Sequence, residues 1–402
     1  MTTSEEIDIV IVGGGICGLA TALALHRKGI GSIVLERSET LRATGAAIGV
    51  LPNGWRALHQ LGLDSTLRST AIPFQRALDI WVDKGVVRET YMSEGEARCI
   101  KRSDLIEALA NELPSGTVRS GFQVLSVDVE KLSSNPVLQL SDGSLIKTKV
   151  LIGCDGANSV IAKFLSLTPL KLFSKCAVRG LTIYPNGHGF SPEFLRIRKD
   201  NHLVGRIPMD EKTVYWFTVM AGTQRDSGMP KDPISIRALT LSLTAGFSTE
   251  IVEMIQNSDL DSLSLTHLRY RAPWSLLLGN SRKGAVTVAG DAWHVMGPFL
   301  GQGGSAALED AVVLARCLSK KAYRPHSNGS GLLLSEHKAR EALDEYVKER
   351  RLRIVHLSSL TYLRGLLLVG DPSLLLRFMC IIILFVVFRD PLKHTRYDCG
   401  EL

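Results

Sequence analysis

The first forty residues constrain the fold more than any other part of the chain. An apolar run at residues 7–12 predicts a buried strand, and the motif Gly13-x-Gly15-x-x-Gly18 and a helical pattern over residues 19–28 follow it. A second strand, residues 32–35, ends on Glu36. In such a βαβ unit the glycines permit a tight turn, close approach of a pyrophosphate to the backbone and close helix packing. The acid can accept hydrogen bonds from ribose hydroxyls. This context favours dinucleotide binding over a simple glycine turn.

Later segments predict a second, β-rich part of the chain. Strand-like patterns fill residues 175–220, whereas residues 103–113 have helical spacing and residues 118–129 and 149–153 again predict strands. A buried strand at 285–289 precedes a long helix from about Ala306. We therefore predict an α/β protein with three regions. They are a discontinuous nucleotide-binding domain (residues 1–70, 100–170 and 280–320), a β-rich substrate domain (71–99 and 171–279) and a helical C-terminal region (332–402).

Charge and cysteine usage exclude several classes of protein. The net charge of +7 comes from dispersed Lys and Arg, without the basic blocks of nucleic-acid binders, so an anionic cofactor or a membrane surface explains it better. The seven cysteines form no Cys-x-x-Cys pair and no zinc spacing, which indicates free thiols in a reducing compartment and no bound metal. Because the first apolar run begins at Ile7, we expect no signal peptide. We expect a cytoplasmic protein.

Two further glycine-containing segments follow predicted strands. The segment Gly153–Ser159 contains Asp155-Gly156, which alone is ordinary turn chemistry. Gly290-Asp291 ends another strand, and the loop 298–305 leads into a helix whose N-terminus could stabilise negative charge. Taken singly, this third segment fits a ligand site and a packed strand–loop–helix equally well.

In their order and separations, the three segments resemble the fingerprints of the single-component FAD-dependent monooxygenases. That family includes p-hydroxybenzoate hydroxylase, salicylate hydroxylase and zeaxanthin epoxidase. The resemblance covers residues 7–353 and is strongest to the plant monooxygenase-one-like group, which shares the phrases Gly-Cys-Asp-Gly-x-Asn-Ser-Val and Ala-Leu-Glu-Asp-Ala-Val-Val-Leu-Ala-Arg-Cys-Leu. It implies a glutathione-reductase-like, Rossmann-type FAD domain with an inserted β-rich substrate domain and a helical C-terminal tail.

The resemblance also implies which residues bind FAD. The first motif would hold the pyrophosphate, Glu36 the ribose, Asp291 the ribityl or pyrophosphate region, and the loop after Pro298 would line the flavin ring, with Ala46 and Ala47 nearby. The implied cofactor-binding residues are Gly13, Gly15, Ile16, Gly18, Glu36, Arg37, Ala47, Arg102, Val124, Asp155, Gly156, Asp291, Pro298, Gly301, Gly303 and Gly304.

The implied reaction is NAD(P)H-dependent hydroxylation by O₂ of a small organic substrate, with an aromatic ring as the leading option, through a C4a-hydroperoxyflavin. Two departures from the family pattern keep alternatives open: Lys163 stands where an arginine is usual, and Ser305 where an asparagine is usual. The alternatives are a flavin-dependent reductase or oxidase of an isoprenoid or lipid-like substrate, and a flavin-binding protein without turnover.

Three residues are candidates for roles beyond cofactor binding. Gln302, beside the flavin loop, could touch substrate or only shape the loop, and Tyr215 shares a strand face with Phe217 that could be catalytic or plain core. His294 fits a structural role near a buried turn better than that of a base.

Near the C-terminus, residues 378–388 form an uninterrupted apolar run with Arg377, Arg389 and Lys393 around it. A membrane-spanning helix needs about 20 apolar residues, so we expect no crossing. A helix buried against the protein and a peripheral anchor at a membrane surface both fit this pattern.

Overall fold

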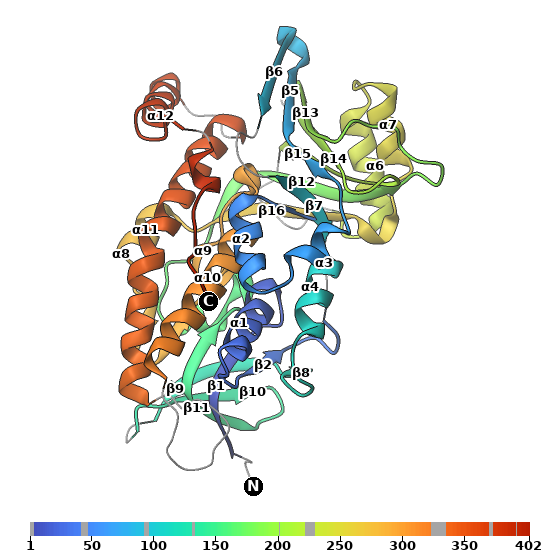
Figure 1. Ribbon diagram of the computed structural model, residues 1–402. Helices are drawn as coiled ribbons and strands as arrows, with labels where there is room; N and C mark the ends of the chain where they lie inside the picture. Colours follow the sequence, from blue (N-terminus) through green and yellow to red (C-terminus); the bar gives the residue numbers. More distant parts are fainter. Residues whose placement is uncertain are drawn as a thin grey trace.

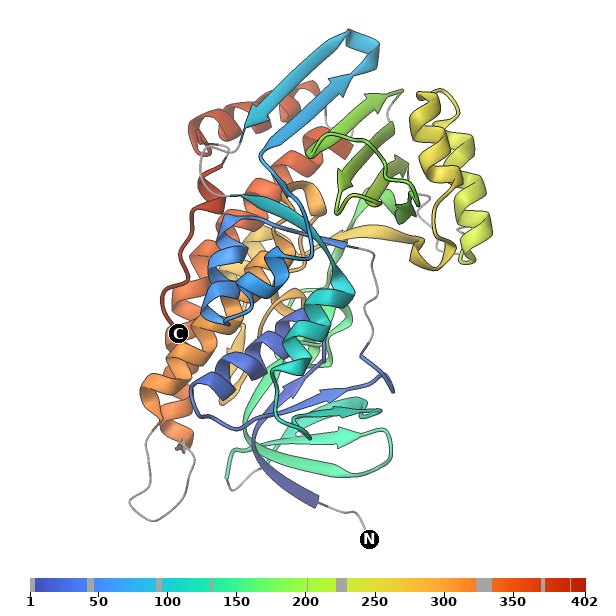
Figure 2. The ribbon, with the colours of Figure 1, turned by 45° about the vertical axis from the view of Figure 1, so that its right-hand side comes forward.

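Two sheets divide most of the strands between them and lie towards opposite ends of the molecule (Figure 1). The computed structural model describes residues 4–41, 47–91, 96–130, 133–200, 202–221, 230–322, 335–369, 373–390 and 392–402. Helices cover both sheets, and the long C-terminal helix runs along one side of the molecule (Figure 2).

The first sheet has a parallel centre in the order β18-β11-β1-β2-β8, and its edge strand β17 is antiparallel to β18. Val12, the last residue of β1, is paired with Gly153 and with Leu35, and Gly153 is paired with Val288 at the end of β18. The three segments that follow these strands therefore leave the sheet at one edge, where α/β proteins bind their ligands. The strands of this sheet are β1 (Ser4–Val12), β2 (Ile33–Glu36), β8 (Val118–Ser120), β9 (Val124–Val129), β10 (Pro136–Leu140), β11 (Leu145–Gly153), β17 (Arg282–Lys283) and β18 (Val286–Val288).

Helices α1 and α10 pack against each other beside this sheet. Helix α1 begins at Ile16, three residues earlier than the pattern predicts, because the last glycine of the motif lies in the first helical turn and not in the loop. The predicted strand 118–129 is likewise two strands, since Gly121 turns the chain with a φ of 80°. The helices around this sheet are α1 (Ile16–Arg27), α2 (Pro52–Gln60), α3 (Asp64–Arg68), α4 (Arg102–Asn111), α5 (Val160–Phe164), α8 (Pro273–Leu278), α9 (Asp291–His294) and α10 (Gly303–Lys321).

The second sheet has seven strands in the order β16-β12-β15-β14-β13-β5-β6, all antiparallel to their neighbours except the β13–β5 pair. Helices α6 (Pro233–Thr244) and α7 (Thr249–Gln256) pack on one face, around the buried Trp216. Tyr215 and Phe217, the neighbours of Trp216 on β15, point to the opposite face. The strands are β5 (Arg76–Trp81), β6 (Val86–Tyr91), β12 (Lys171–Ile183), β13 (Glu193–Lys199), β14 (His202–Pro208), β15 (Thr213–Ala221) and β16 (Ser264–Tyr270).

A small sheet of β3 (Ala47–Val50), β7 (Ala97–Lys101) and β4 (Pro73–Phe74) joins the two larger ones. Together these elements form an α/β fold with a Rossmann-type nucleotide-binding sheet and a helical C-terminal region, as the sequence predicts. Short 3₁₀ turns cover Val82–Lys84, Gly156–Asn158, Leu260–Ser262, Pro298–Leu300 and Lys393–Thr395.

The C-terminal region contains α11 (Glu336–Val369), which packs along α10 and α8, and α12 (Leu374–Val386). The side chains of α12 are largely exposed, with Leu374 at 85% and Phe385 at 79%. Only Cys380 among its residues is buried. The apolar run therefore does not form a helix buried against the protein, which is one of the two structures that the sequence pattern fits.

Candidate functional site

A cavity of about 1280 Å³ lies between the two large sheets and extends from the carboxyl edge of the first to the open face of the second. Of the predicted cofactor-binding and catalytic residues that the structure describes, Gly18 alone is absent from its wall. The predicted residues that line it are Gly13, Gly15, Ile16, Glu36, Arg37, Ala47, Arg102, Val124, Asp155, Gly156, Tyr215, Asp291, Pro298, Gly301, Gln302, Gly303 and Gly304. Ala46 lies outside the described residues. The structure thus brings all three motifs to one space.

The glycines of the first motif serve two purposes. Gly13 has a φ of +107°, and a Cβ there would lie 2.5 Å from the carbonyl oxygen of Cys154, while a Cβ at Gly18 would lie 1.9 Å from the carbonyl oxygen of Gly13. Both are therefore required by packing. A Cβ at Gly15 would meet no atom within 4 Å. Gly15 is the N-cap of α1, which has no side-chain cap, so its first-turn N–H groups are available to an anion in the cavity.

Glu36 is fixed at the end of β2 by two backbone donors. Its Oε2 accepts a hydrogen bond from the N–H of Gly14 at 2.7 Å, and its Oε1 accepts one from the N–H of Ser38 at 2.9 Å. This carboxylate therefore braces the glycine loop, and its remaining lone pairs face the cavity, where a ribose could donate to them.

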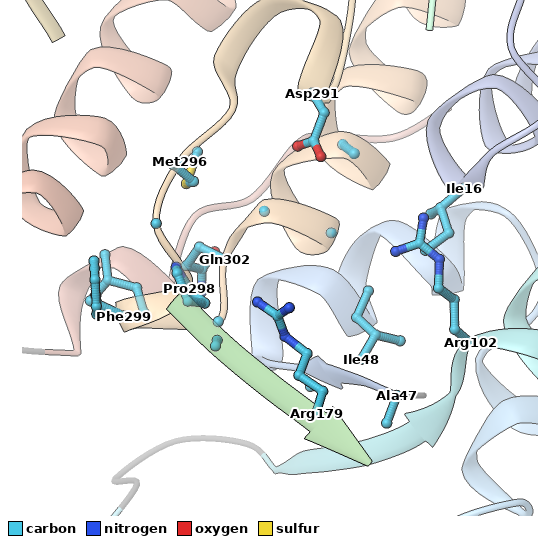
Figure 3. Close-up of a pocket in the computed structure, with 18 of the residues that line it drawn as sticks. Ile16, Ala47, Ile48, Arg102, Arg179, Asp291, Met296, Pro298, Phe299 and Gln302 are labelled. Atoms are coloured by element: carbon cyan, nitrogen blue, oxygen red, sulfur yellow. The ribbon is translucent and has the colours of Figure 1, made fainter. Parts of the chain in front are cut away.

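Arg102, at the start of α4, and Asp291, at the start of α9, extend into the cavity from different elements (Figure 3). The Nε of Arg102 is buried and has no hydrogen-bond partner among the described residues. Burial lowers the pKa of this guanidinium, and the charge of Asp291 opposes that shift. A half-buried cation with an unused donor fits a phosphate group.

The second motif presents a carboxylate that is only half satisfied. Oδ2 of Asp155 accepts a hydrogen bond from the N–H of Val160 at 2.7 Å, whereas Oδ1 is buried with no partner among the described residues. Burial raises the pKa of Asp155. The next residue, Gly156, has a φ of +76° and no atom within 4 Å of the position its Cβ would take. This turn therefore leaves room for a ligand against its backbone.

The third motif forms the end of the cavity nearest β12. Pro298 and Phe299 lie beside Arg179, and Ala47 and Ile48 face them from β3 (Figure 3). A Cβ at Gly301 or Gly303 would meet no atom within 4 Å, whereas a Cβ at Gly304 would lie 2.1 Å from Cδ1 of Ile48. The loop thus offers bare backbone and the N-terminus of α10 to the cavity.

Beneath this loop lies a buried polar network. The amides of Gln302 and Asn53 bond reciprocally at 2.8 and 3.2 Å, and both side chains are 0% exposed. Asn53 also donates to Glu309 at 2.6 Å. Both ends of the Gln302 amide are therefore engaged, which favours the loop-shaping alternative for this residue; its catalytic role stays a prediction.

His294 belongs to the same network and not to the cavity wall. Its Nε2 lies 2.6 Å from Oδ2 of Asp310, and both side chains are 0% exposed. Arg350 of α11, equally buried, pairs with Asp310 at 2.7 Å and with Glu309 at 2.8 Å. Burial alone would raise the pKa of each carboxyl, but His294 and the arginines outweigh it and hold the pKa of both below its ordinary value.

The floor of the cavity is the open face of the second sheet. Tyr215 and Phe217 have ring centroids 6.2 Å apart, and Phe217 and Phe194 6.1 Å apart. A Cβ at Gly205 would lie 2.4 Å from the ring of Phe217, so this glycine lets the ring lie over β14. Burial raises the pKa of Tyr215 to about 12, with Arg179 opposing the shift. This hydroxyl therefore stays protonated at neutral pH.

Sequence reasoning missed several charged residues of the wall, namely Arg88, Arg179, Arg196, Arg198 and Arg364. One signal was available: Phe194, Arg196 and Arg198 alternate along β13, which puts them on one face of a strand. That pattern does not say that the face borders a cavity.

The cavity has the features that FAD requires: a helix N-terminus and Arg102 for a pyrophosphate, Glu36 for a ribose, and bare glycine backbone at Gly301 and Gly303 for a flat ring. Both unpartnered buried polar atoms described above, on Arg102 and Asp155, lie in this wall. The residues present therefore fit the cofactor.

Comparison with known proteins agrees with this fit. The family model described as FAD binding domain matches residues 6–358. The chain is 52% identical to Monooxygenase 1 of Arabidopsis thaliana over 404 residues, covering 99% of this chain and 100% of that protein. It is 29% identical to 3-amino-4-hydroxybenzoate 2-monooxygenase PtmB3 of Streptomyces platensis, over 77% of this chain and 79% of that protein.

Among solved structures, a variant of Klebsiella pneumoniae HpxO complexed with FAD superposes with a TM-score of 0.79 at 22% identity, covering 97% of this chain and 98% of that one. The likeness extends the shared fold over nearly the whole molecule. The chain therefore belongs to the FAD binding domain family, and it is an FAD-dependent monooxygenase.

Proposed function

We propose that this enzyme uses NADH or NADPH and O₂ to hydroxylate an organic substrate that lies on the aromatic floor of the cavity. One observation carries the proposal: the cofactor cradle and the floor formed by Tyr215, Phe217 and Phe194 are walls of the same cavity. A relative named for an aromatic substrate, the aminohydroxybenzoate monooxygenase, supports an aromatic substrate here, and contacts between aromatic rings would hold it.

Each motif has a distinct task in this proposal. The N-terminus of α1 and Arg102 bind the pyrophosphate, Glu36 binds the adenosine ribose with Arg37 and Val124 at the adenine, and Asp291 binds the polyol. Bound FAD would supply the redox chemistry, accepting a hydride from NAD(P)H and activating O₂. We assign residues 1–70, 100–170 and 280–320 to the FAD domain, and residues 71–99 and 171–279 to the substrate domain.

The protein's own residues position the substrate and keep water away from it. The apolar floor excludes water, and the protonated hydroxyl of Tyr215 can donate a hydrogen bond to a substrate oxygen. The guanidinium of Arg179 lies beside Pro298 and Phe299 (Figure 3), where it can hold an anionic oxygen of a ring hydroxyl that is being activated. The reciprocal pair of Gln302 and Asn53 keeps the loop above the floor in place.

The test is oxidation of NADH and NADPH by the FAD-loaded enzyme against a panel of phenolic acids, from single-ring to long-bodied ones, under ¹⁸O₂. A substrate should stimulate oxidation at least about tenfold, which corresponds to roughly 1.4 kcal/mol off the limiting barrier, and its product should carry one labelled oxygen. Product without label would favour the reductase or oxidase alternative. A flavin that stays oxidised with both nucleotides would favour a flavin-binding protein without turnover.

We further propose that α12 attaches the enzyme to an anionic membrane surface. Its exposed residues are almost all apolar, and the exposed Arg377, Arg389 and Lys393 beside them suit anionic headgroups. Within the described ranges, no helix has both the length and the apolar character needed to cross a bilayer. The β5–β6 hairpin, with Val86 and Val87 exposed, lies at the same end of the molecule (Figure 1; Figure 2).

Flotation with vesicles of phosphatidylcholine alone or with added phosphatidylserine tests this attachment. The wild type should bind the anionic vesicles, and the double variant Leu375→Glu/Phe385→Glu should bind at least tenfold more weakly with an unchanged circular dichroism spectrum. Retention of the wild type through both high-salt and carbonate washes would refute a peripheral contact. Absence of vesicle binding, with a dimer that the double variant dissociates, would identify the face as a contact between copies.

A further inference from the structure

Four arginines gather at the end of the cavity farthest from β12. Arg88 lies on β6, Arg196 and Arg198 lie on β13, and Arg364 lies on α11, and all four line the cavity. One carboxylate lies among them: Asp79 of β5 pairs with Arg196 at 2.5 Å and with Arg198 at 2.6 Å. Against four cations, this single anion leaves a formal charge of +3 in a partly enclosed space.

Two of these arginines have N–H donors to which no described residue offers an acceptor. Arg364 is partly buried and makes no hydrogen bond or ion pair with any residue that the structure describes. The Nε of Arg196 is buried without a partner in the same ranges. Burial, together with the charges of Arg196 and Arg88, lowers the pKa of Arg364. Like charges held this close are unfavourable, so an anion would relieve the repulsion as well as accept the unused donors.

The register of the sheet places this cluster relative to the flavin end. Arg88 is paired with Asp79, and Asp79 with Arg196, so these three side chains form one row. The same row continues through Gly205 and Phe217 to Arg179. Three strand spacings, each about 4.8 Å, separate Arg196 on β13 from Arg179 on β12, which puts the two about 14 Å apart.

The surface between the two charged ends is apolar. Phe194, Leu203, Phe217 and Val219 line the cavity there, and Arg196 itself lies over the ring of Phe194 at 4.9 Å. Leu367 and Leu368 of α11 add apolar surface next to Arg364. A ligand that spans the floor therefore meets apolar side chains along its length and guanidinium groups at its outer end.

We propose that the arginine cluster of Arg88, Arg196, Arg198 and Arg364 binds the anionic group of an elongated, largely apolar substrate. Arg196 of the cluster lies about 14 Å along the sheet from Arg179 at the flavin end, so the substrate is a long-bodied acid and not a single-ring acid such as benzoate. The inference rests on the proposed function for the place of oxygen transfer, but the anion subsite stands on its own contacts.

The test is calorimetric binding to the FAD-loaded enzyme of three probes: decanoate, decanol and benzoate. Decanoate should bind at least tenfold more tightly than either decanol or benzoate. Arg364→Gln should reduce the preference for decanoate over decanol at least threefold, and so should Arg88→Gln, which changes an exposed side chain and cannot disturb the core. Arg119→Gln, whose arginine pairs with Glu5 away from the cavity, is the matched control and should change nothing.

Equal affinity for decanoate and decanol would overturn the proposal, and so would variants that weaken both probes alike. NADP⁺ binding distinguishes the other source of an anion: if Arg88→Gln and Arg364→Gln raise the Kd of NADP⁺ tenfold and leave that of decanoate unchanged, the cluster serves the nucleotide and the proposal fails. These measurements need no turnover. A failure of NAD(P)H oxidation would therefore refute the proposed function while leaving the anion subsite measurable.

Discussion

Replacing Gly15 by valine separates cofactor binding from folding more cleanly than any other single change in the first motif. The backbone of Gly15 is extended, with φ −83° and ψ −175°, a conformation that valine adopts readily. A Cβ at this position meets no protein atom within 4 Å, because it points into the cavity. The apoprotein should therefore fold, at a cost of at most about 1 kcal/mol for an unfavourable N-cap residue.

The effect on FAD should be much larger. The added isopropyl group would occupy the space through which the pyrophosphate reaches the first turn of α1. Two charge-assisted hydrogen bonds, each contributing about 1.5–3 kcal/mol, would be lost. Their combined loss of about 3–6 kcal/mol raises the Kd of FAD by roughly two to four orders of magnitude.

Fluorescence quenching on titration of apoprotein with FAD measures this Kd, and thermal unfolding of the apoprotein followed by circular dichroism measures the fold. Gly18→Ala is the contrasting variant: its Cβ would lie 1.9 Å from the carbonyl oxygen of Gly13, so it should destabilise the apoprotein itself. A Gly15→Val protein that binds FAD within threefold of the wild type would refute the assignment of the pyrophosphate to this helix.

Three further changes test other parts of the site. Asp291→Ala should weaken FAD binding without altering circular dichroism, and an unchanged Kd would count against its role at the polyol. Gln302→Ala removes both amide bonds to the partner side chain, so it should raise the fraction of NAD(P)H lost as peroxide more than it changes FAD affinity; a constant peroxide fraction would contradict this. Arg350→Met leaves Glu309 and Asp310 undercompensated and should cost about 3–5 kcal/mol of unfolding free energy at pH 7. Because their pKa values are lowered in the fold, these carboxylates stabilise it above their unfolded values of about 4 and lose that contribution as the pH falls. Urea unfolding should therefore show a smaller deficit at pH 4, and a deficit that does not change with pH would disprove the charge argument.

The cofactor end of the site was predictable because its information is local. Strand, turn and helix follow one another within residues 7–28, and Gly13 and Gly18 are required by close packing within this short unit. The position of the helix start was wrong by one turn, since Gly18 resembles a loop residue in composition but packs as part of α1.

The outer end of the cavity was not predictable in the same way. Asp79 and Arg364 lie far apart in the sequence, and only the pairing of β5 with β13 and the position of α11 bring them to the same wall. The alternating arginines of β13 are as typical of a strand face exposed to solvent as of one that lines a cavity. Composition also could not show whether residues 378–388 are buried or exposed, because a buried helix and an exposed apolar helix have the same sequence pattern.

The chain after α12 returns to the body of the protein and is held there. Arg353 donates to the carbonyl oxygen of His394 at 2.7 Å, Arg56 donates to that of Thr395 at 3.2 Å, and the N–H of Leu402 donates to Gln60 at 2.9 Å. The chain on both sides of α12 is therefore held by the rest of the protein, so the helix does not form a free tail. If α12 binds a membrane as proposed, it can insert only shallowly into one leaflet, because both of its ends return to the same side. Cutting the chain before α12 would also remove Leu392 and His394 from the cavity wall, so point substitutions, not truncation, isolate what the helix does.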